Sequence, residues 1–306
     1  MTKLIDFQQY QQFDNLELIA RQIVEGFLTG LHRSPFHGFS VEFAEHRLYN
    51  KGESTKHIDW KLFARTDKLF VKRYEEETNL RCHLIIDNSS SMYYPFKTQV
   101  ESKLAFSVFC ASALIYLLRR QRDAVGLSVF SENVTLHTDA KLSSVHAQML
   151  YAELSGLLNE YTATKKTITN AAQALHEIAD NIHKRSLVII FSDMMDSVSN
   201  EELIAALQHL RYNKHEVILF HVTDKNHEVN FEFENRPHRF IDMETGEELK
   251  LNPNDVREYY RQQINSYLSE IKLKCGQYNI DLIEADINEA FNKVLLEFLL
   301  KRNNLF

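Results

Sequence analysis

One carboxylate and two hydroxyl groups occur at alternate positions in a short segment of the chain, at Asp87, Ser89 and Ser91. The segment ends the apolar run 83–87 and is rich in serine, a pattern typical of a tight turn after a buried strand. On such a turn the three side chains can direct oxygen atoms at one point, and hard oxygen donors suit Mg²⁺, Mn²⁺ or Ca²⁺. By itself the motif is a weak signal, because any serine-rich turn after a strand can contain it.

Two more oxygen donors are expected at the same place in the fold. Asp193 follows the apolar run 187–191, and Thr169 begins a segment with helical periodicity. In open α/β sheets, ligands bind outside the carboxyl ends of the strands, where such residues gather. Each residue also has a structural alternative, since a threonine can cap a helix and an aspartate can cap the loop that follows it. The predicted metal ligands are Asp87, Ser89, Ser91, Thr169 and Asp193.

From residue 81 onward, apolar runs that suit buried strands alternate with segments that have helical periodicity. The expected strands are 83–87, 124–130, 134–137, 187–191, 217–222 and 280–283. The expected helices are 98–121, 143–158, 169–182, 200–212, 253–275 and 288–300. This alternation predicts an α/β fold with a central, largely parallel sheet covered by helices on both faces.

The part before residue 81 has a different pattern. A helical stripe of apolar residues lies in 15–29, and short strands are expected at 41–43 and 69–71. We therefore expect an N-terminal accessory region over residues 1–80 and the α/β domain over residues 81–306. Within that domain, residues 224–251 interrupt the alternation, and 240–247 is typical of a hairpin with a glycine-containing turn.

Composition limits the classes of function. A net charge of −7 over 306 residues argues against a nucleic-acid-binding protein. The basic bias of residues 33–73 suits either an acidic partner or a solvated surface. The longest apolar stretch, 104–118, is shorter than the ~20 residues that span a bilayer, and no signal peptide is expected, so we expect no membrane span and a cytoplasmic protein. The cysteines Cys82, Cys110 and Cys275 are widely spaced and odd in number, which indicates thiols in a reducing compartment.

The alternate spacing at residues 87–91, a later threonine and an aspartate after a further strand resemble the metal-ion-dependent adhesion site of von Willebrand factor A domains. More narrowly, the chain resembles the bacterial family known as domain of unknown function fifty-eight, from about residue 26 to the C-terminus. The motifs that carry this resemblance are Gly38-Phe39-Ser40-Val41-Glu42-Phe43, Arg47-Leu48-Tyr49, Ile58-Asp59-Trp60, Ala64-Arg65, Val71-Lys72-Arg73-Tyr74-Glu75 and Asp242-x-Glu244-Thr245-Gly246.

The resemblance implies a von Willebrand factor A-like fold and association with MoxR-type AAA+ ATPases. The sequence departs from the pattern at two places. The glycines that often precede the adhesion-site threonine are replaced by residues 164–166, which leaves Thr167 as a competitor, although the position of Thr169 fits the family pattern better. Met194 stands where other von Willebrand factor A domains commonly have glycine. Members of the family often carry N-terminal membrane spans, and we expect none here.

The predicted function follows from the kind of ligand. Serine and threonine are neutral, so a bound Mg²⁺ or Mn²⁺ with an open coordination position would attract a further anionic oxygen, such as a partner's Asp or Glu side chain. We expect a metal-dependent protein–protein interaction module, an adaptor for a MoxR-type ATPase or for its client, and not an enzyme. The alternatives are a metal-independent scaffold and a metal-dependent hydrolase. The hydrolase is disfavoured because the sequence has no His-Glu-x-x-His, no Gly-x-Ser-x-Gly and no phosphate-binding loop.

Overall fold

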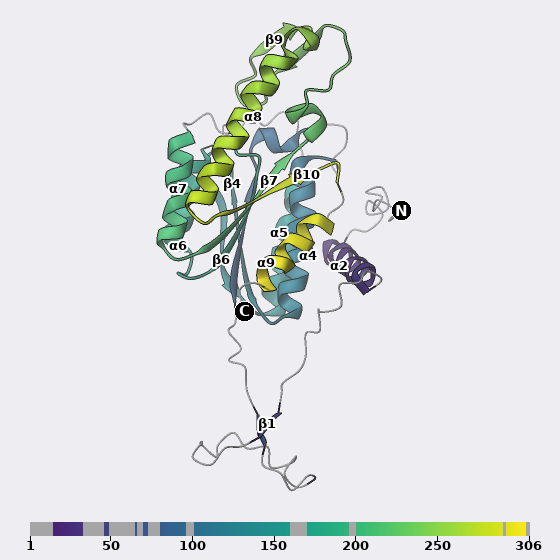
Figure 1. The fold of residues 1–306 in the computed structure, drawn as a ribbon. Helices are drawn as coiled ribbons and strands as arrows, with labels where there is room; N and C mark the ends of the chain where they lie inside the picture. Colours follow the sequence, from purple (N-terminus) through teal and green to yellow (C-terminus); the bar gives the residue numbers. More distant parts are fainter. Residues whose placement is uncertain are drawn as a thin grey trace. The chain divides into compact units, whose positions relative to one another are not determined.

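The computed structural model describes residues 15–32, 46–48, 65, 70–72, 80–95, 101–159, 170–195, 200–289 and 292–303 (Figure 1). The chain forms two compact units. The smaller is Leu28–Asn79, and the larger combines Met1–Phe27 with Leu80–Phe306. The smaller unit contains the short antiparallel pair β1 (His46–Leu48) and β2 (Phe70–Lys72). The strand expected at 41–43 lies outside the described residues.

Helix α2 (Leu16–His32) runs from the larger unit into the smaller one. Its apolar stripe is buried as far as Phe27, and Glu17 accepts a hydrogen bond at 2.9 Å from Arg119 of the larger unit. The first part of α2 thus groups with the α/β domain, and the accessory region over residues 1–80 stays a prediction.

The larger unit is built on a six-stranded sheet (Figure 1) with the strand order β10-β7-β6-β3-β4-β5. Its strands are β3 (Arg81–Asp87), β4 (Ala124–Phe130), β5 (Val134–Lys141), β6 (Leu187–Ser192), β7 (Glu216–Thr223) and β10 (Asp281–Asp286). All neighbours are parallel except β5, which pairs antiparallel with β4 at one edge. The predicted α/β fold with a central, largely parallel sheet is confirmed.

Helices cover both faces of this sheet, with α6, α7 and α8 on one face and α4, α5 and α9 on the other (Figure 1). The helices are α4 (Lys103–Arg120), α5 (Ser144–Asn159), α6 (Ala171–Asn181), α7 (Asn200–Tyr212), α8 (Pro253–Gln277) and α9 (Asn292–Asn303). Short helical turns occur at η2 (Ser90–Tyr93) and η3 (Lys225–Val229). In the part of the chain that the structure describes, none of the helices is both long and apolar enough to cross a membrane.

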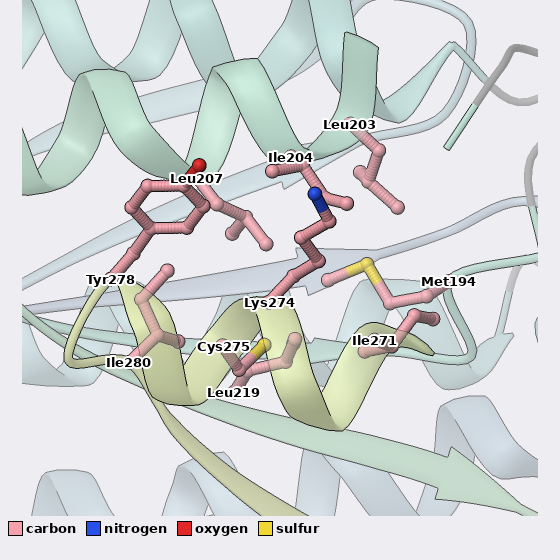
Figure 2. Close-up of a pocket in the computed structure, with 10 residues that line it drawn as sticks. All are labelled: Met194, Leu203, Ile204, Leu207, Leu219, Ile271, Lys274, Cys275, Tyr278 and Ile280. Carbon is pink, nitrogen blue, oxygen red and sulfur yellow. The ribbon is translucent and has the colours of Figure 1, made fainter. Parts of the chain in front are cut away.

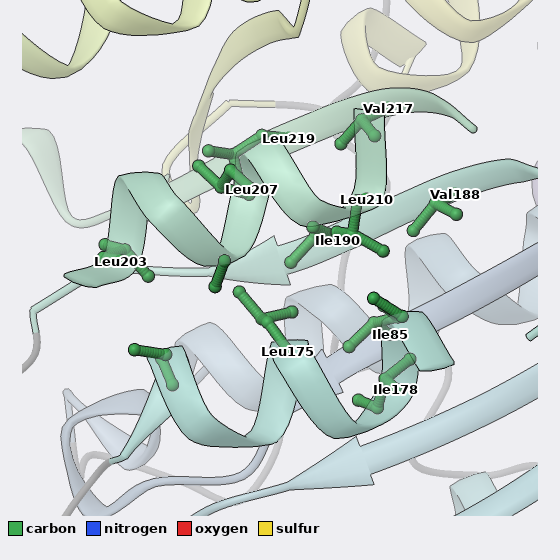
Figure 3. Close-up of a cluster of buried hydrophobic side chains, with 14 of the residues drawn as sticks. Ile85, Leu175, Ile178, Val188, Ile190, Leu203, Leu207, Leu210, Val217 and Leu219 are labelled. Atoms are coloured by element: carbon green, nitrogen blue, oxygen red, sulfur yellow. The ribbon is translucent and has the colours of Figure 1, made fainter. Parts of the chain in front are cut away.

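The strands alternate their side chains between the two layers of helices. Ile85, Ile190 and Leu219 point into the layer formed by α6 and α7, where they pack against Leu175 and Leu207 (Figure 3). The intervening residues of the same strands are also buried. Both faces of the sheet are thus apolar, which explains why these strands have continuous hydrophobic sequences. All three cysteines are buried as thiols.

The predicted hairpin is confirmed as β8 (His238–Ile241) paired antiparallel with β9 (Glu248–Leu251). Asp242 starts the turn by accepting hydrogen bonds from the backbone N–H groups of Glu244 and Thr245 at 2.8 and 2.7 Å. Gly246 has φ of 76°, a conformation that glycine adopts without steric cost. Helix α8 follows directly, with proline at its first turn.

A histidine is buried in the centre of the sheet. His83 on β3 is 2% exposed, and its Nε2 lies 2.8 Å from Ser128 Oγ, which lies 2.8 Å from His137 Nδ1. Gly126 makes room for the ring, because a Cβ there would lie 2.6 Å from His83 Nδ1. Burial, and then the nearby His137 and His215 rings, lower the pKa of His83 to about 3.

The depressed pKa of His83 predicts a pH dependence of stability. Below about pH 6.5 the unfolded chain binds a proton at this position, whereas the folded chain binds it only near pH 3. The free energy of unfolding should therefore fall on acidification through this window, by up to about 1.4 kcal/mol per pH unit from this group. Denaturant titrations at several pH values should show that the free energy of unfolding depends less steeply on pH in His83→Gln than in the wild type. An equal pH dependence in the two proteins would show that His83 does not cause the loss of stability in acid.

Candidate metal centre

The ends of two neighbouring strands place the candidate ligands together. Strand β3 ends at Asp87, and its neighbour β6 ends at Ser192, immediately before Asp193. The two strands are parallel, with Ile86 opposite Phe191, so both ends lie at the carboxyl edge of the sheet. Both aspartates are buried, at 0% and 1% exposure. The sequence prediction that they share one edge is correct.

The carboxylate of Asp87 is held by hydrogen bonds at both oxygens. Oδ1 accepts the backbone N–H of Ser89 at 2.9 Å, and Oδ2 accepts the hydroxyl of Ser192 at 2.6 Å. The Ser192 hydroxyl in turn accepts the backbone N–H of Met194 at 2.9 Å. Ser192 thus links the turn after β3 to the turn after β6.

The two predicted serine ligands lie between the carboxylates. Their hydroxyl oxygens, Ser89 Oγ and Ser91 Oγ, are 3.0 Å apart. The Ser89 side chain hydrogen-bonds Asp87, and the Ser91 side chain hydrogen-bonds Asp193. An octahedral Mg²⁺ with bonds of about 2.0–2.1 Å places neighbouring ligand oxygens about 2.9 Å apart. The separation of the two hydroxyls therefore fits adjacent positions on such an ion.

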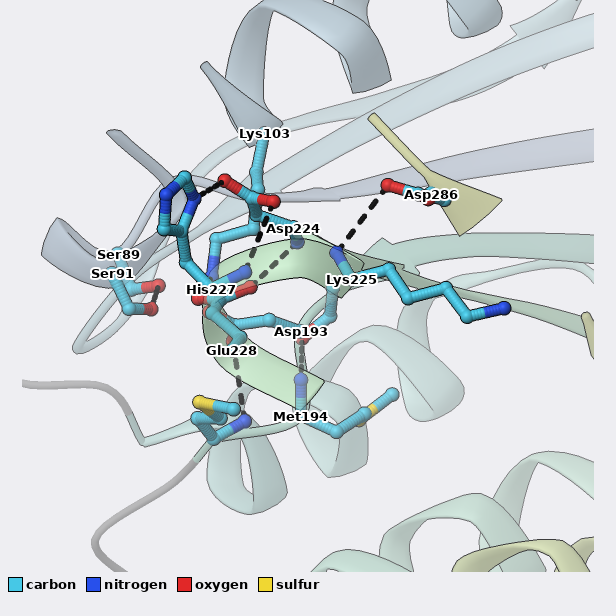
Figure 4. A network of polar contacts seen from close by, with 12 residues as sticks. Ser89, Ser91, Lys103, Asp193, Met194, Asp224, Lys225, His227, Glu228 and Asp286 are labelled. Atoms are coloured by element: carbon cyan, nitrogen blue, oxygen red, sulfur yellow. Dashed lines mark hydrogen bonds and ion pairs between the residues drawn. The ribbon is translucent and has the colours of Figure 1, made fainter. Parts of the chain in front are cut away.

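Sequence reasoning missed a buried lysine at this site. Lys103, the first residue of α4, is 0% exposed, and its Nζ lies 2.7 Å from Asp193 Oδ2 and 2.5 Å from Glu228 Oε1 (Figure 4). Asp193 Oδ1 accepts the backbone N–H of Met195 at 3.1 Å. Lys103 directly precedes the long apolar stretch 104–118, and nothing in the sequence pattern indicates that its ammonium group turns toward a strand end.

Glu228 comes from a segment that the sequence suggested was a mere insertion. It lies on η3, where its Oε2 accepts the backbone N–H of Asp224 at 2.7 Å. Asp224 itself accepts hydrogen bonds from His227 Nδ1 at 2.7 Å and from Asn288 Nδ2 at 2.9 Å. The sequence did contain a signal that this segment belongs to the site: Asp224 follows the predicted strand 217–222, just as Asp193 follows the predicted strand 187–191.

The buried charges shift the pKa of each carboxyl group. Burial, and then repulsion from Asp193, raise the pKa of Asp87 to about 7, although its serine hydrogen bonds oppose this. Burial also raises the pKa of Glu228. For Asp193, burial opposes ionisation, but the Lys103 ammonium outweighs it and lowers the pKa. Lys103 pairs with two of these carboxyl groups, Asp193 and Glu228. The partners of Asp87 are instead backbone and hydroxyl groups of Ser89 and Ser192, which are not cationic.

Packing around Met194 accounts for a methionine at a position where the adhesion-site pattern commonly has glycine. Met194 has φ of 52°, a region that favours glycine. Its carbonyl accepts a hydrogen bond from Tyr267 Oη of α8, and its side chain reaches the apolar space between α7 and α8, beside Leu207 and Ile271 (Figure 2). The cavity left there is only about 10 Å³. Packing between the two helices therefore compensates for the unfavourable backbone conformation.

Four of the five predicted ligands are described, and the structure brings them together: Asp87, Ser89, Ser91 and Asp193. Thr169 and its competitor Thr167 lie outside the described residues. Helix α6 is capped by Asn170, whose side chain accepts the backbone N–H of Gln173 at 3.2 Å. The described residues contain no cluster of three or more His, Cys, Asp or Glu side chains arranged for a metal, so any ion here depends on the hydroxyls.

The chain belongs to the family described as Protein of unknown function DUF58, which matches residues 45–268. Uncharacterized proteins of Mycobacterium bovis and Mycobacterium tuberculosis are 23% identical over 209 residues, covering 68% of this chain and 63% of each relative. The match therefore spans less than two thirds of those relatives' length.

Two solved structures are similar in part. The conserved hypothetical protein BatB from Bacteroides thetaiotaomicron is 14% identical, with a TM-score of 0.43, covering 74% of this chain and 99% of that one. An aerotolerance-related membrane protein from Bacteroides fragilis is 17% identical, with a TM-score of 0.39, covering 70% of this chain and 99% of that one.

The geometry predicts that Ser192 stabilises the site. Replacing it in Ser192→Ala leaves Asp87 Oδ2 and the Met194 N–H without their buried partner, which should lower the free energy of unfolding by about 1–3 kcal/mol. The matched control is Ser112→Ala on α4, a buried serine that donates only to the helical carbonyl of Val108. Urea denaturation should show a clearly larger loss for Ser192→Ala. Equal losses would show that the link between the two turns adds nothing.

Proposed function

We propose that this chain binds a divalent cation, Mg²⁺ or Mn²⁺, through Asp87, Ser89, Ser91 and Asp193, with Thr169 as a further ligand. The bound ion then recognises a carboxylate of a protein partner. The observation that carries the proposal is a pair of serine hydroxyls 3.0 Å apart, held between two buried aspartates. Such a set of hard oxygens at a strand edge suits these ions.

The charge of the site supports a cation. Burial, and then repulsion from Asp193, raise the pKa of Asp87, and Lys103 is shared between Asp193 and Glu228. Burying carboxylates without full compensation is costly, and a dication relieves that cost. When bound, the ion would supply a Lewis-acidic centre with an open coordination position.

Binding of a partner, not catalysis, is the role that we infer. The two serines are neutral ligands, so the ion retains positive charge with which to attract an anionic oxygen. The groups that contact the Asp87 carboxylate are the Ser89 amide and the hydroxyls of Ser89 and Ser192, none of which is a general base. A carboxylate side chain of a protein would complete the coordination.

The resemblance to von Willebrand factor A-like proteins suggests who the partner is. A MoxR-type AAA+ ATPase, or a client that it remodels, is our proposed partner. The cytoplasm is the proposed compartment, in keeping with three buried thiols. A metal-independent scaffold is the competing function, and one observation favours it: Lys103 already neutralises part of the charge.

Thermal melting with and without metal tests the first step. In Mg²⁺ or Mn²⁺ at about a hundred times the dissociation constant, the wild type should gain about 2.7 kcal/mol over the same protein in EDTA. The double variant Ser89→Ala/Ser91→Ala should lose most of this gain, because it lacks both hydroxyls. Ser107→Ala/Ser112→Ala is the control, since it removes two buried hydroxyls that donate to helical carbonyls of α4. A wild type that melts identically in millimolar metal and in EDTA would leave the scaffold as the better description.

Binding to an ATPase tests the second step. We expect the MoxR-type ATPase of the same organism, immobilised without nucleotide, to bind the wild type in Mg²⁺ and to release it in EDTA. The variant without the Ser89 and Ser91 hydroxyls should bind at least tenfold more weakly, whereas the Ser107/Ser112 control should bind normally. Binding that persists in EDTA would argue against coordination through the ion.

A further inference from the structure

Lys103 occupies an unfavourable position for a cation. It is the first residue of α4, next to the N-cap Ser102, where the partial positive charge of a helix N-terminus repels an ammonium group. Its side chain is also 0% exposed. A buried lysine at this end of a helix is tolerated only if anions compensate it, and the Lys103 ammonium group forms ion pairs with two carboxylates.

These two carboxylates differ in their relation to the candidate metal site. Asp193 is a candidate ligand, and Lys103 Nζ lies 2.7 Å from its Oδ2. Its Oδ1 already accepts the Met195 N–H. A cation that approaches Asp193 therefore meets an oxygen that Lys103 already occupies, and two positive charges on one carboxylate repel each other.

Glu228 provides the second anchor for the lysine. Its Oε1 lies 2.5 Å from Lys103 Nζ, while its Oε2 is fixed by the backbone N–H of Asp224. The carbonyl of Glu228 also accepts a hydrogen bond from Tyr260 Oη at 2.8 Å, so α8 helps to hold this residue in place. Lys103 can thus keep one ion pair while it gives up the other.

We propose that Lys103 is a positioning residue that acts as a built-in cation of this site: it competes with the divalent ion for Asp193, and Glu228 controls that competition by drawing the ammonium group away. This inference rests on the proposed function, because it concerns the same ligands. It predicts that the chain's own charges keep the ion weakly held and exchangeable.

Two substitutions at the ion pair should shift metal affinity in opposite directions. Lys103→Met removes the competing charge but keeps a long apolar side chain, so Mn²⁺ should bind at least tenfold more tightly. Glu228→Gln leaves the ammonium group with Asp193 alone and removes a nearby negative charge, so Mn²⁺ should bind severalfold more weakly. A purely structural role for the ion pair would not produce opposite signs.

The measurement is the Mn²⁺ dissociation constant of the full chain, from the electron paramagnetic resonance signal of free Mn²⁺ at fixed pH and ionic strength. Lys225→Met is the matched control, because it removes the same charge from an exposed side chain on η3. It should change the dissociation constant by less than threefold. Near-UV circular dichroism and melting in EDTA establish that each variant is folded, and Lys103→Met should melt lower than the wild type in EDTA and recover in Mn²⁺.

The outcomes separate this inference from the proposed function. If the wild type binds Mn²⁺ and folded Lys103→Met binds it no better, the inference is wrong and the proposed function stands. If only Lys103→Met binds Mn²⁺, the inference holds, and the wild type uses its lysine in place of a metal. If neither binds, both are wrong. Should Lys103→Met fail to fold, Glu228→Gln decides, since equal or tighter binding in that variant overturns the inference.

Discussion

The structure depends on the burial of two aspartates, Asp87 and Asp193, at the ends of adjacent parallel strands. The register of β3 and β6 brings these strand ends to the same edge, so the chain cannot keep the sheet and separate the carboxylates. Ionised groups in such surroundings need partners, because the cost of removing them from water is several kcal/mol each. Much of the local structure at this edge supplies those partners.

Each neighbouring element contributes a different kind of compensation. The turn after β3 provides the Ser89 backbone N–H and the two hydroxyls, and the end of β6 provides the Ser192 hydroxyl. Helix α4 contributes a full positive charge through Lys103, and η3 contributes Glu228, which fixes that charge from the other side. The compensation is partial: burial, and then repulsion from Asp193, keep the pKa of Asp87 raised to about 7 despite its serine hydrogen bonds.

The sequence was sufficient for features that depend on local patterns. Strands buried on both faces have continuous apolar runs, which is why the order of strands and helices was predictable. The grouping of the candidate ligands Asp87, Ser89 and Ser91 was predictable because the three residues lie on one turn. Lys103 and Glu228 were not, because their meeting depends on packing between segments 125 residues apart. The helix pattern of α4 indicates burial for residue 103 but gives no reason for a charge there.

The same geometry constrains how a metal could work here. An ion held by Asp87, Asp193 and the two hydroxyls with no ammonium group competing for Asp193 would bind tightly and need no partner. At this site the Lys103 ammonium pairs with Asp193 and would reduce its attraction for an added cation, while Asp87, which has no cationic partner among the described residues, would maintain some attraction. If an ion binds as proposed, this balance would give weak binding by the chain alone and stronger binding when another anionic oxygen joins the ion. Weak intrinsic affinity is thus consistent with a site that is completed by a carboxylate from another protein, and the buried lysine is the residue that distinguishes such a site from a permanent structural metal centre.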